Sequence, residues 1–312
     1  MLGLSLSTVR SSGPAAETPI GANWSAVTLP SGALGYNAVA VSGTTWVACC
    51  ESSNQHARST DNGATWAVSL GISARLWFDI AASGSTWIMV AIGGTNGAER
   101  STDDGATWST IGLPASHAWW AVAASGTTWV VVGNNSNQFA RSTDDGANWS
   151  ILTLSASRQW KGIAASGTTW VAVAGGGGGT DQAARSTDGG ATWSDITLSS
   201  SRDWRGVAVN GTTWVAVAGG TDQATRSTDG GATWSAITLP ASRSWTSVAA
   251  RGNTWIAVAD DSTNQAARST DNGATWSAIT LPFSVTRRGV AANATAVVAV
   301  AYGNVQGARS IS

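Results

Sequence analysis

One short motif recurs along the whole chain at nearly constant spacing. It has the form Ser-x-Asp-x-Gly-Ala-Thr/Asn-Trp, and its copies lie about 42 residues apart. The motif tryptophans are Trp24, Trp66, Trp108, Trp149, Trp193, Trp234 and Trp276. A period in the forties, built from short Thr-, Val- and Trp-rich runs and glycine-rich turns, is typical of four strands per repeat arranged radially. We therefore predict an all-β fold, a seven-bladed β-propeller of four-stranded blades.

One copy of the motif is divided between the two ends of the chain. The sequence ends with Ser310-Ile311-Ser312, the first three motif positions, and residues 20–24 supply the last five. The two halves form one motif only if the ends meet, so we predict that an N-terminal strand completes the C-terminal blade. Such closure also removes an open sheet edge. We assign residues 20–312 to the propeller and residues 1–19 to an N-terminal tail or anchoring arm.

The copy at residues 201–239 shows the plan of one repeat. Strands are predicted at residues 204–209, 212–218, 223–227 and 234–239. The motif between the last two strands reads as a self-contained turn. The Asp229 carboxylate accepts backbone N–H bonds, and Gly231 adopts a conformation closed to other side chains.

Composition and charge limit the partners of the chain. Charged residues are 11% of the sequence, and 17 basic against 18 acidic residues leave a net charge of −1. This balance gives no electrostatic footprint for nucleic acid or an anionic membrane surface. No apolar run has the length of a membrane span, so we expect no membrane insertion. Residues 1–9 begin without a basic residue, and no secretory signal is detected.

Cysteine and histidine give no pattern for a cofactor or metal. Cys49 and Cys50 are adjacent in a strand-like run, which favours two small buried apolar residues over a reactive pair. His56 and His117 fall in different repeats, and the motif has too few ligands for a calcium loop. We expect neither a metal nor a cofactor.

The motif, seen in full at residues 227–234, resembles the Asp-box of bacterial neuraminidase repeats. The resemblance covers residues 20–312. This family includes sialidases, non-catalytic propeller lectins, photosystem assembly factors and phage proteins. The resemblance implies a propeller whose boxes are structural and lie away from the ligand face, and a lectin-like or phage virion-associated member.

A sialidase is the enzymatic reading that the resemblance suggests. That chemistry resembles a retaining glycosidase with a tyrosine nucleophile activated by a glutamate, an aspartic acid and three arginines. The chain has Tyr36 and Tyr302, but neither Glu51 nor Glu99 matches the activating position. Near-identical repeats also argue against a single asymmetric active site. We predict a protein that is not an enzyme.

The loops between one repeat and the next supply the candidate ligand-binding residues. Each places a serine, an arginine or histidine, and a tryptophan near the mouth of the ring, and the loops after the second strands fall on the same face. Aromatic rings beside Arg, Asp and Gln side chains are typical of sugar sites. The candidates are Trp77, Trp119, Trp160, Trp204, Trp245, Arg158, Arg202, Arg243, Asp181, Gln182, Asp222 and Gln223. The alternative is that these tryptophans pack between blades.

An arginine precedes the motif serine in every repeat. One residue per repeat at one depth is typical of a scaffold position, in which the arginine pairs with the motif aspartate or donates to backbone carbonyls. A functional ring is the alternative. The residues are Arg58, Arg100, Arg141, Arg185, Arg226, Arg268 and Arg309.

Three functions follow from these observations. The first is a non-enzymatic binding propeller for surface carbohydrate or a receptor, as a phage virion or tail protein, placed on a virion or outside the cell. The second is a purely structural decoration or adaptor of a phage particle, attached to other virion proteins through residues 1–19. Leu2, Leu4, Leu6 and Val9 alternate there like a β-arm that adds to a partner's sheet. The third is a sialidase-like glycosidase.

Overall fold

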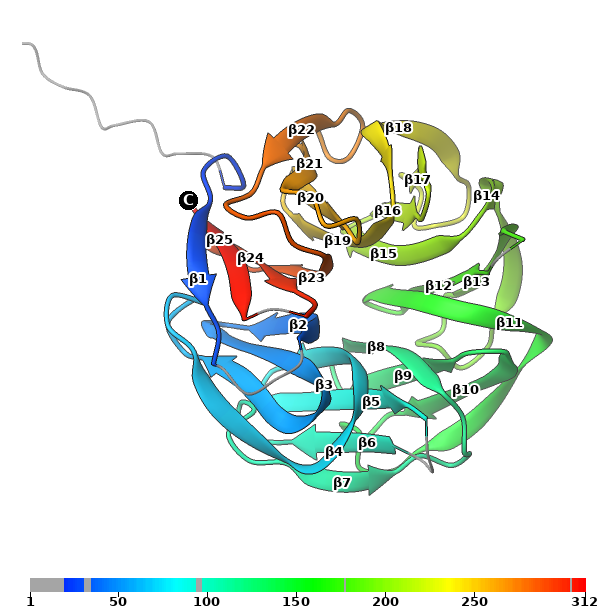
Figure 1. Ribbon diagram of the computed structural model, residues 1–312. Helices are drawn as coiled ribbons and strands as arrows, with labels where there is room; N and C mark the ends of the chain where they lie inside the picture. The colour runs from blue at the N-terminus through cyan, green and yellow to red at the C-terminus, as the bar shows by residue number, and fades with distance from the viewer. Residues whose placement is uncertain (1–19, 31–34, 94–96, 177, 304) are drawn as a thin grey trace, which may run out of the picture.

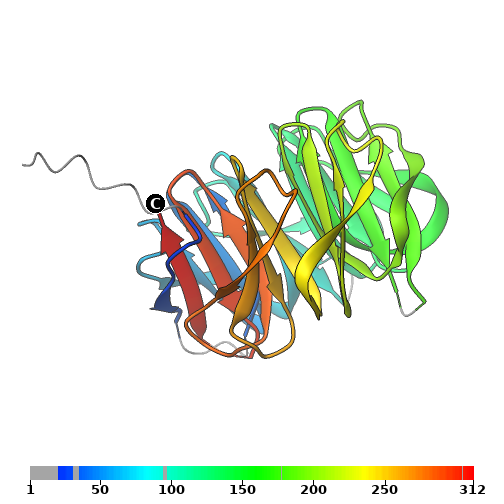
Figure 2. The ribbon, with the colours of Figure 1, turned by 90° about the horizontal axis from the view of Figure 1, so that it is seen from above.

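The computed structural model describes residues 20–30, 35–93, 97–176, 178–303 and 305–312, and every regular element in them is a β-strand. The strands are arranged as a ring (Figure 1). Seen from above in Figure 2, they run between the two faces of that ring. The chain is therefore an all-β propeller. The predicted tail at residues 1–19 lies outside the described residues.

The described strands pair in five antiparallel sheets. Three sheets have four strands. They are β15 (Trp204–Asn210), β16 (Thr213–Ala218), β17 (Thr221–Ser227) and β18 (Ser235–Arg243); β19 (Trp245–Arg251), β20 (Thr254–Ala259), β21 (Gln265–Ser269) and β22 (Ser277–Thr280); and β23 (Arg287–Ala292), β24 (Ala296–Ala301), β25 (Gln306–Ile311) and β1 (Ser25–Thr28).

The other two sheets are larger because a long strand continues from one repeat into the next. The six-stranded sheet holds β2 (Tyr36–Ser42), β3 (Thr45–Ser59), β4 (Ala67–Ser83), β5 (Thr86–Ile92), β6 (Gly97–Ser101) and β7 (Ser109–Gly112). The seven-stranded sheet holds β8 (Trp119–Ser125), β9 (Thr128–Gly133), β10 (Ser136–Ser142), β11 (Ser150–Ser166), β12 (Thr169–Gly175), β13 (Thr180–Ser186) and β14 (Ser194–Arg202). The finer expectation of seven four-stranded blades thus stays a prediction.

The innermost strands contact one another in a closed circle. Their order is β2, β4, β8, β11, β15, β19, β23 and back to β2. In each of them the residues that follow the connection between two repeats face the centre of the ring. β4 and β11 also include that connection and the outer strand of the preceding repeat. This arrangement positions the site described below.

The predicted closure of the ring is confirmed. β1 pairs antiparallel with β25, with Ser25 opposite Arg309 and Thr28 opposite Gln306. In Figure 1 the blue N-terminal strand lies beside the red C-terminal strand. The two halves of the divided motif therefore form one turn.

The motif turn has the predicted geometry. The Asp229 carboxylate accepts the Thr233 backbone N–H at 3.0 Å and the Thr233 hydroxyl at 2.6 Å. Ser227 Oγ accepts the Gly231 N–H at 2.9 Å, and Gly231 has a φ of +78°. The Trp234 indole donates to the Gly231 carbonyl but is only half-buried. The turn is thus held together by its own side chains.

The repeated arginines are scaffold residues that donate to backbone carbonyls, the second of the two scaffold roles predicted for them. Each Nε donates to a backbone carbonyl in the motif turn of the following repeat. Arg58, Arg100, Arg141, Arg185, Arg226, Arg268 and Arg309 donate respectively to Asp104, Asp145, Gly189, Gly230, Asn272, Ile20 and Asn62, at 2.7 to 3.0 Å. The last two bonds carry the series across the junction of the chain ends.

The core lies between neighbouring sheets and is rich in tryptophan. The largest fully buried side chains are Trp46, Trp77, Trp87, Trp119, Trp129, Trp160, Trp170, Trp204, Trp214, Trp245 and Trp255. Cys49 and Cys50 are also fully buried, as predicted, and burial raises the pKa of the Cys50 thiol to about 12.

Candidate functional site

The structure corrects the role expected for the tryptophans of the connecting loops. Trp77, Trp119, Trp160, Trp204 and Trp245 are each at most 1% exposed. Their indoles pack in the core, so they offer no face to a sugar. The alternative prediction, packing between repeats, describes them. The Trp160 and Trp204 indoles also donate to the backbone carbonyls of Ser136 and Ser200.

The polar candidates lie together in the loops but outside the central cavity. Arg202 pairs with Thr180 across β13 and β14, which brings it next to Asp181 and Gln182. Arg243 pairs with Thr221 in the same way, next to Asp222 and Gln223. These pairings place the two sets of candidate residues side by side, and their role in ligand binding stays a prediction.

Their side chains are bonded within the protein, in two cases to another candidate and otherwise to other residues. Gln182 donates to Asp181, and Gln223 to Asp222. Arg158 forms an ion pair with Asp195 at 3.3 Å. Arg243 donates to Asp261, Thr263 and Gln265. Exposed pairs of this kind contribute little free energy.

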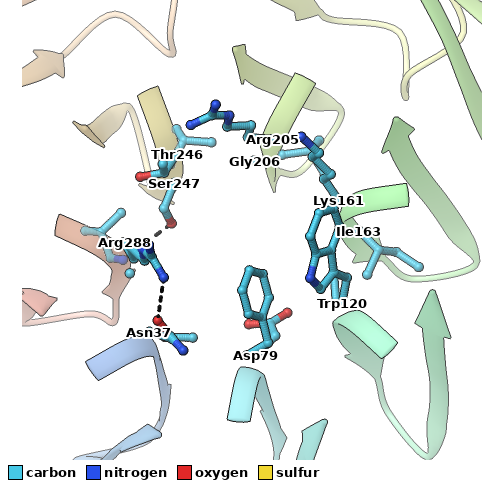
Figure 3. Close-up of a pocket in the computed structure, with 18 of the residues that line it drawn as sticks. Asn37, Asp79, Trp120, Lys161, Ile163, Arg205, Gly206, Thr246, Ser247 and Arg288 are labelled. Atoms are coloured by element: carbon cyan, nitrogen blue, oxygen red, sulfur yellow. Dashed lines mark hydrogen bonds between the residues drawn. The ribbon is translucent and has the colours of Figure 1, made fainter. Parts of the chain in front are cut away.

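A cavity of about 420 Å³ lies at the centre of the ring. It is lined by residues of the inner strands β2, β4, β8, β11, β15, β19 and β23. Figure 3 shows their side chains converging from all sides. A single concave site shared by many elements is the usual form of a ligand pocket.

Each inner strand carries a β-bulge where it meets this cavity. The register of the inner strand against its neighbour shifts at the same place in every repeat. A bulge adds one residue to a strand and redirects its side chain. The residues at these positions, called the bulge residues below, are Asn37, Phe78, Trp120, Lys161, Arg205, Thr246 and Arg288, and all of them line the cavity.

The bulge residues vary although the surrounding scaffold repeats. The position two residues further along the strand is always Val or Ile, as in Val39, Ile80 and Val122. The bulge position instead holds an amide, two different aromatic rings, three cations and a hydroxyl. A repeated fold with one variable position facing one cavity produces an asymmetric site.

One side of the cavity is aromatic. Phe78 and Trp120 stack with their ring centroids 5.3 Å apart and an interplanar angle of 17°. The Lys161 ammonium lies 5.4 Å from the Trp120 ring centroid. These three bulge residues come from consecutive repeats and form a continuous wall.

The remaining wall is polar and cationic. Lys161 Nζ lies 2.6 Å from one oxygen of Asp203, and Arg205 Nε lies 2.8 Å from the other. Burial opposes ionisation of Asp203, but the hydrogen bonds from Lys161 and Arg205 outweigh it and lower the pKa of this carboxyl. Arg288 donates to Asn37 at 3.1 Å (Figure 3). Its guanidinium also lies over the Tyr302 ring.

Asp79 is the acidic exception at the position that follows the bulge residue. The other repeats have a small residue there, such as Gly162 or Gly206. Its carboxylate accepts the backbone N–H groups of Ile80 and Val122, both at 2.9 Å. Burial raises the pKa of Asp79 to about 7, although the two backbone bonds act in the opposite direction. A carboxyl of this kind in a cavity is a mark of functional sites.

The structure also brings Tyr302 close to Glu51, which sequence reasoning did not foresee. A hydrogen bond to Glu51 raises the pKa of Tyr302. A raised pKa works against a tyrosine acting as a nucleophile. Tyr36 is buried, and burial raises its pKa as well.

Sequence reasoning selected the residue next to the one that lines the central cavity. Phe78, Trp120, Lys161, Arg205 and Thr246 each directly follow one of the five buried tryptophans. Since neighbouring residues in a strand point to opposite faces, a tryptophan in the core places the next side chain toward the centre. An alignment of the seven repeats would have identified the bulge position, because its residue type changes while the residue two positions further along is always Val or Ile.

No protein-family model matches the chain, and no curated protein matches it. Solved structures do. YCF48 bound to D1 peptide is 17% identical, with a TM-score of 0.71 and coverage of 95% of this chain and 99% of that one. Virginiamycin B lyase from Staphylococcus aureus is 13% identical, with a TM-score of 0.79 and coverage of 93% and 99%. YCF48 from Cyanidioschyzon merolae is 14% identical, with a TM-score of 0.70 and coverage of 93% and 98%. At these identities the likeness shows the propeller fold.

In the described part of the chain, no group of three or more His, Cys, Asp or Glu side chains is placed to hold a metal ion. None of the elements described is a helix long and apolar enough to cross a membrane.

Proposed function

We propose that this chain is a non-enzymatic binding propeller that holds its ligand at the central cavity. The ligand is surface carbohydrate or a receptor. The observation that carries the proposal is the set of seven bulges, which direct side chains of six different types into one cavity of about 420 Å³. A fold that needed only stability would repeat this position with the rest of the scaffold.

The proposed site is a single asymmetric cavity, not the loops between repeats from which the candidate residues were taken. The tryptophans of those loops are buried, whereas Phe78 and Trp120 reach the cavity. Aromatic rings beside hydrogen-bonding cations are suited to sugars, whose C–H faces stack and whose hydroxyls accept hydrogen bonds. One site per ring gives an affinity that depends on its own contacts rather than on multivalency.

A glycan array and a panel of surface receptors test the proposal with three proteins. Wild type is expected to retain a ligand that the Trp120→Ala variant loses. Trp234→Ala is the matched control, because Trp234 is a half-buried tryptophan of the motif turn outside the cavity. Equal retention by wild type and Trp120→Ala would exclude the central cavity as the site.

We infer in addition that the ring is a seven-bladed propeller of the Asp-box type. The closed circle of inner strands supports seven blades, and the long strands β4 and β11, each of which continues from one repeat into the next, account for the larger sheets. The self-bonded turn at Ser227 and Asp229 supports the Asp-box resemblance.

A second candidate function is a structural decoration or adaptor in a phage particle, and therefore a place on a virion or outside the cell. An observation that favours a protein partner is the exposure of Val68, Leu70 and Leu76 along β4, with Leu70 59% exposed. The similar YCF48 structure holds a peptide. Deleting residues 1–19 is expected to leave folding and sugar binding unchanged and to prevent incorporation into a particle only if this candidate is correct.

The sialidase-like alternative has a direct assay. Wild type is expected to release no fluorophore from a fluorogenic sialoside, because the raised pKa of Tyr302 works against a tyrosine nucleophile. Turnover that disappears in Tyr302→Phe would show the protein to be an enzyme.

A further inference from the structure

We propose that the central cavity recognises an acidic sugar, a uronic acid residue whose carboxylate meets the cations and whose ring lies on the aromatic wall. The inference rests on the proposed function and names the chemistry of its ligand. It follows from which hydrogen-bonding groups of the cavity are already used within the protein.

The carboxylates of the wall are occupied by internal donors. Asp203 receives Lys161, Arg205 and the backbone N–H of Gly176, all at 2.6 to 2.8 Å. Asp79 receives two backbone N–H groups. These acids therefore have little acceptor capacity left for ligand hydroxyls.

The cations of the wall keep donors in reserve. A guanidinium has five N–H groups in a fixed plane. Arg205 uses Nε for Asp203 and Nη1 for Ser244. Arg288 uses Nε for Asp260 and Nη1 for Asn37. The other terminal nitrogen of each guanidinium, Nη2, takes part in none of these four hydrogen bonds. Asp260, which also lines the cavity, receives Arg288 Nε at 3.4 Å and balances part of the positive charge. The remaining N–H groups are charged donors, and an acceptor-rich anion matches such donors better than a neutral group.

The aromatic wall defines what carries the anion. Phe78 stacks on Trp120, as the order of repeats requires. Trp120 is followed around the ring by Lys161 and Arg205 (Figure 3). A pyranose ring stacked there places a carboxylate on its edge toward the cations. A uronic acid joins the flat C–H face and the carboxylate in one residue, whereas an acidic peptide side chain has no such face.

Calorimetric titration with trigalacturonate tests the inference. The neutral probe is the same trisaccharide with its carboxyl groups reduced to alcohols, and triglutamate is the acidic peptide probe. Wild type is expected to bind trigalacturonate about tenfold or more tightly than either of the others, because hydrogen bonds to charged groups contribute more than neutral ones. Added salt is expected to weaken this binding.

Two arginine variants locate the effect. Arg205→Gln is expected to lose about tenfold or more in affinity for trigalacturonate. Arg251→Gln is the matched control, since Arg251 lies at the far end of β19, opposite Thr254 in the hairpin, and does not line the cavity. Arg205→Lys, which keeps the positive charge, is expected to fall between wild type and Arg205→Gln. Thermal melts of the arginine variants show whether each protein remains folded.

Three outcomes would overturn the inference. Equal, Trp120-dependent binding of the acidic and the reduced trisaccharide refutes the carboxylate and leaves the proposed function standing. Arg205-dependent binding of triglutamate alone refutes the sugar and favours a peptide ligand. Absence of binding by all three probes refutes the uronic acid, while the array and the receptor panel judge the proposed function separately.

Discussion

The backbone N–H of Gly21 donates to the hydroxyl of Ser310 at 2.8 Å, although the two residues are 289 positions apart in the chain. The same bond within an intact motif, from Gly231 to Ser227, measures 2.9 Å. The junction of the chain ends therefore reproduces the local turn. In the intact motif this bond is a local contact. Between Gly21 and Ser310 the same bond helps to close the ring.

Ser310→Ala is expected to weaken this closure. The substitution leaves the buried Gly21 N–H without its acceptor, which costs about 1–3 kcal/mol. Hydrogen exchange should accelerate in β1 and β25. Ser227→Ala removes the equivalent bond inside a continuous segment, so its effect should stay within that turn. Equal, local exchange patterns in the two variants would contradict a role of Ser310 in closure.

Gly206→Ala is expected to destabilise the ring from its inside. A Cβ at this position would lie 2.7 Å from the backbone carbonyl oxygen of Thr246 on the next inner strand. Overpacking of this kind costs about 1–3 kcal/mol. Gly112→Ala is the control, because a Cβ there meets nothing within 4 Å. Equal free energies of unfolding for both variants in urea would show that the inner strands tolerate separation.

Asp79 is expected to make stability depend on pH between about 4 and 7. Its pKa is about 7 in the folded state and 3.8 when unperturbed, so the folded state binds the proton more tightly. Stability from this group rises as pH falls through 7 and levels off below the unfolded pKa. His56 acts oppositely in this range, because burial lowers its pKa to about 4.

The comparison of wild type with Asp79→Asn isolates the aspartate. The difference in melting temperature between the two proteins should shift in favour of wild type as the pH falls from 7 to 4. The motif carboxyls do not titrate in this range: hydrogen bonds from Asn148 and Ser142 lower the pKa of Asp144 to about 2. A constant difference over this range would mean that Asp79 titrates normally.

Trp204→Ala is expected to act on stability first. The indole is fully buried, and truncating such a side chain costs about 3–5 kcal/mol. Trp120 is partly exposed in the cavity, so Trp120→Ala should lower the free energy of unfolding by less than Trp204→Ala. Chemical denaturation of both variants checks this order. A Trp204→Ala protein as stable as wild type would return this residue to the candidate ligand face.

The sequence predicted one repeat closely and its ligand face poorly. The strand expected at residues 204–209 is β15, Trp204–Asn210, and the one expected at 223–227 lies within β17, Thr221–Ser227. These elements follow from local alternation and turn chemistry. The orientation of Trp204 depends instead on the adjacent sheet, which its own repeat does not contain.

By itself, the sequence determined the repeat, the motif turn and the meeting of the chain ends, because each depends on contacts within one unit or on the division of one motif. The tertiary structure alone decided that Trp204 enters the core and that Arg205 reaches the central cavity. The bulge that separates these two side chains lies in the pairing of β15 with β16, but the cavity that Arg205 lines is formed by inner strands of different repeats, so no single repeat specifies the site.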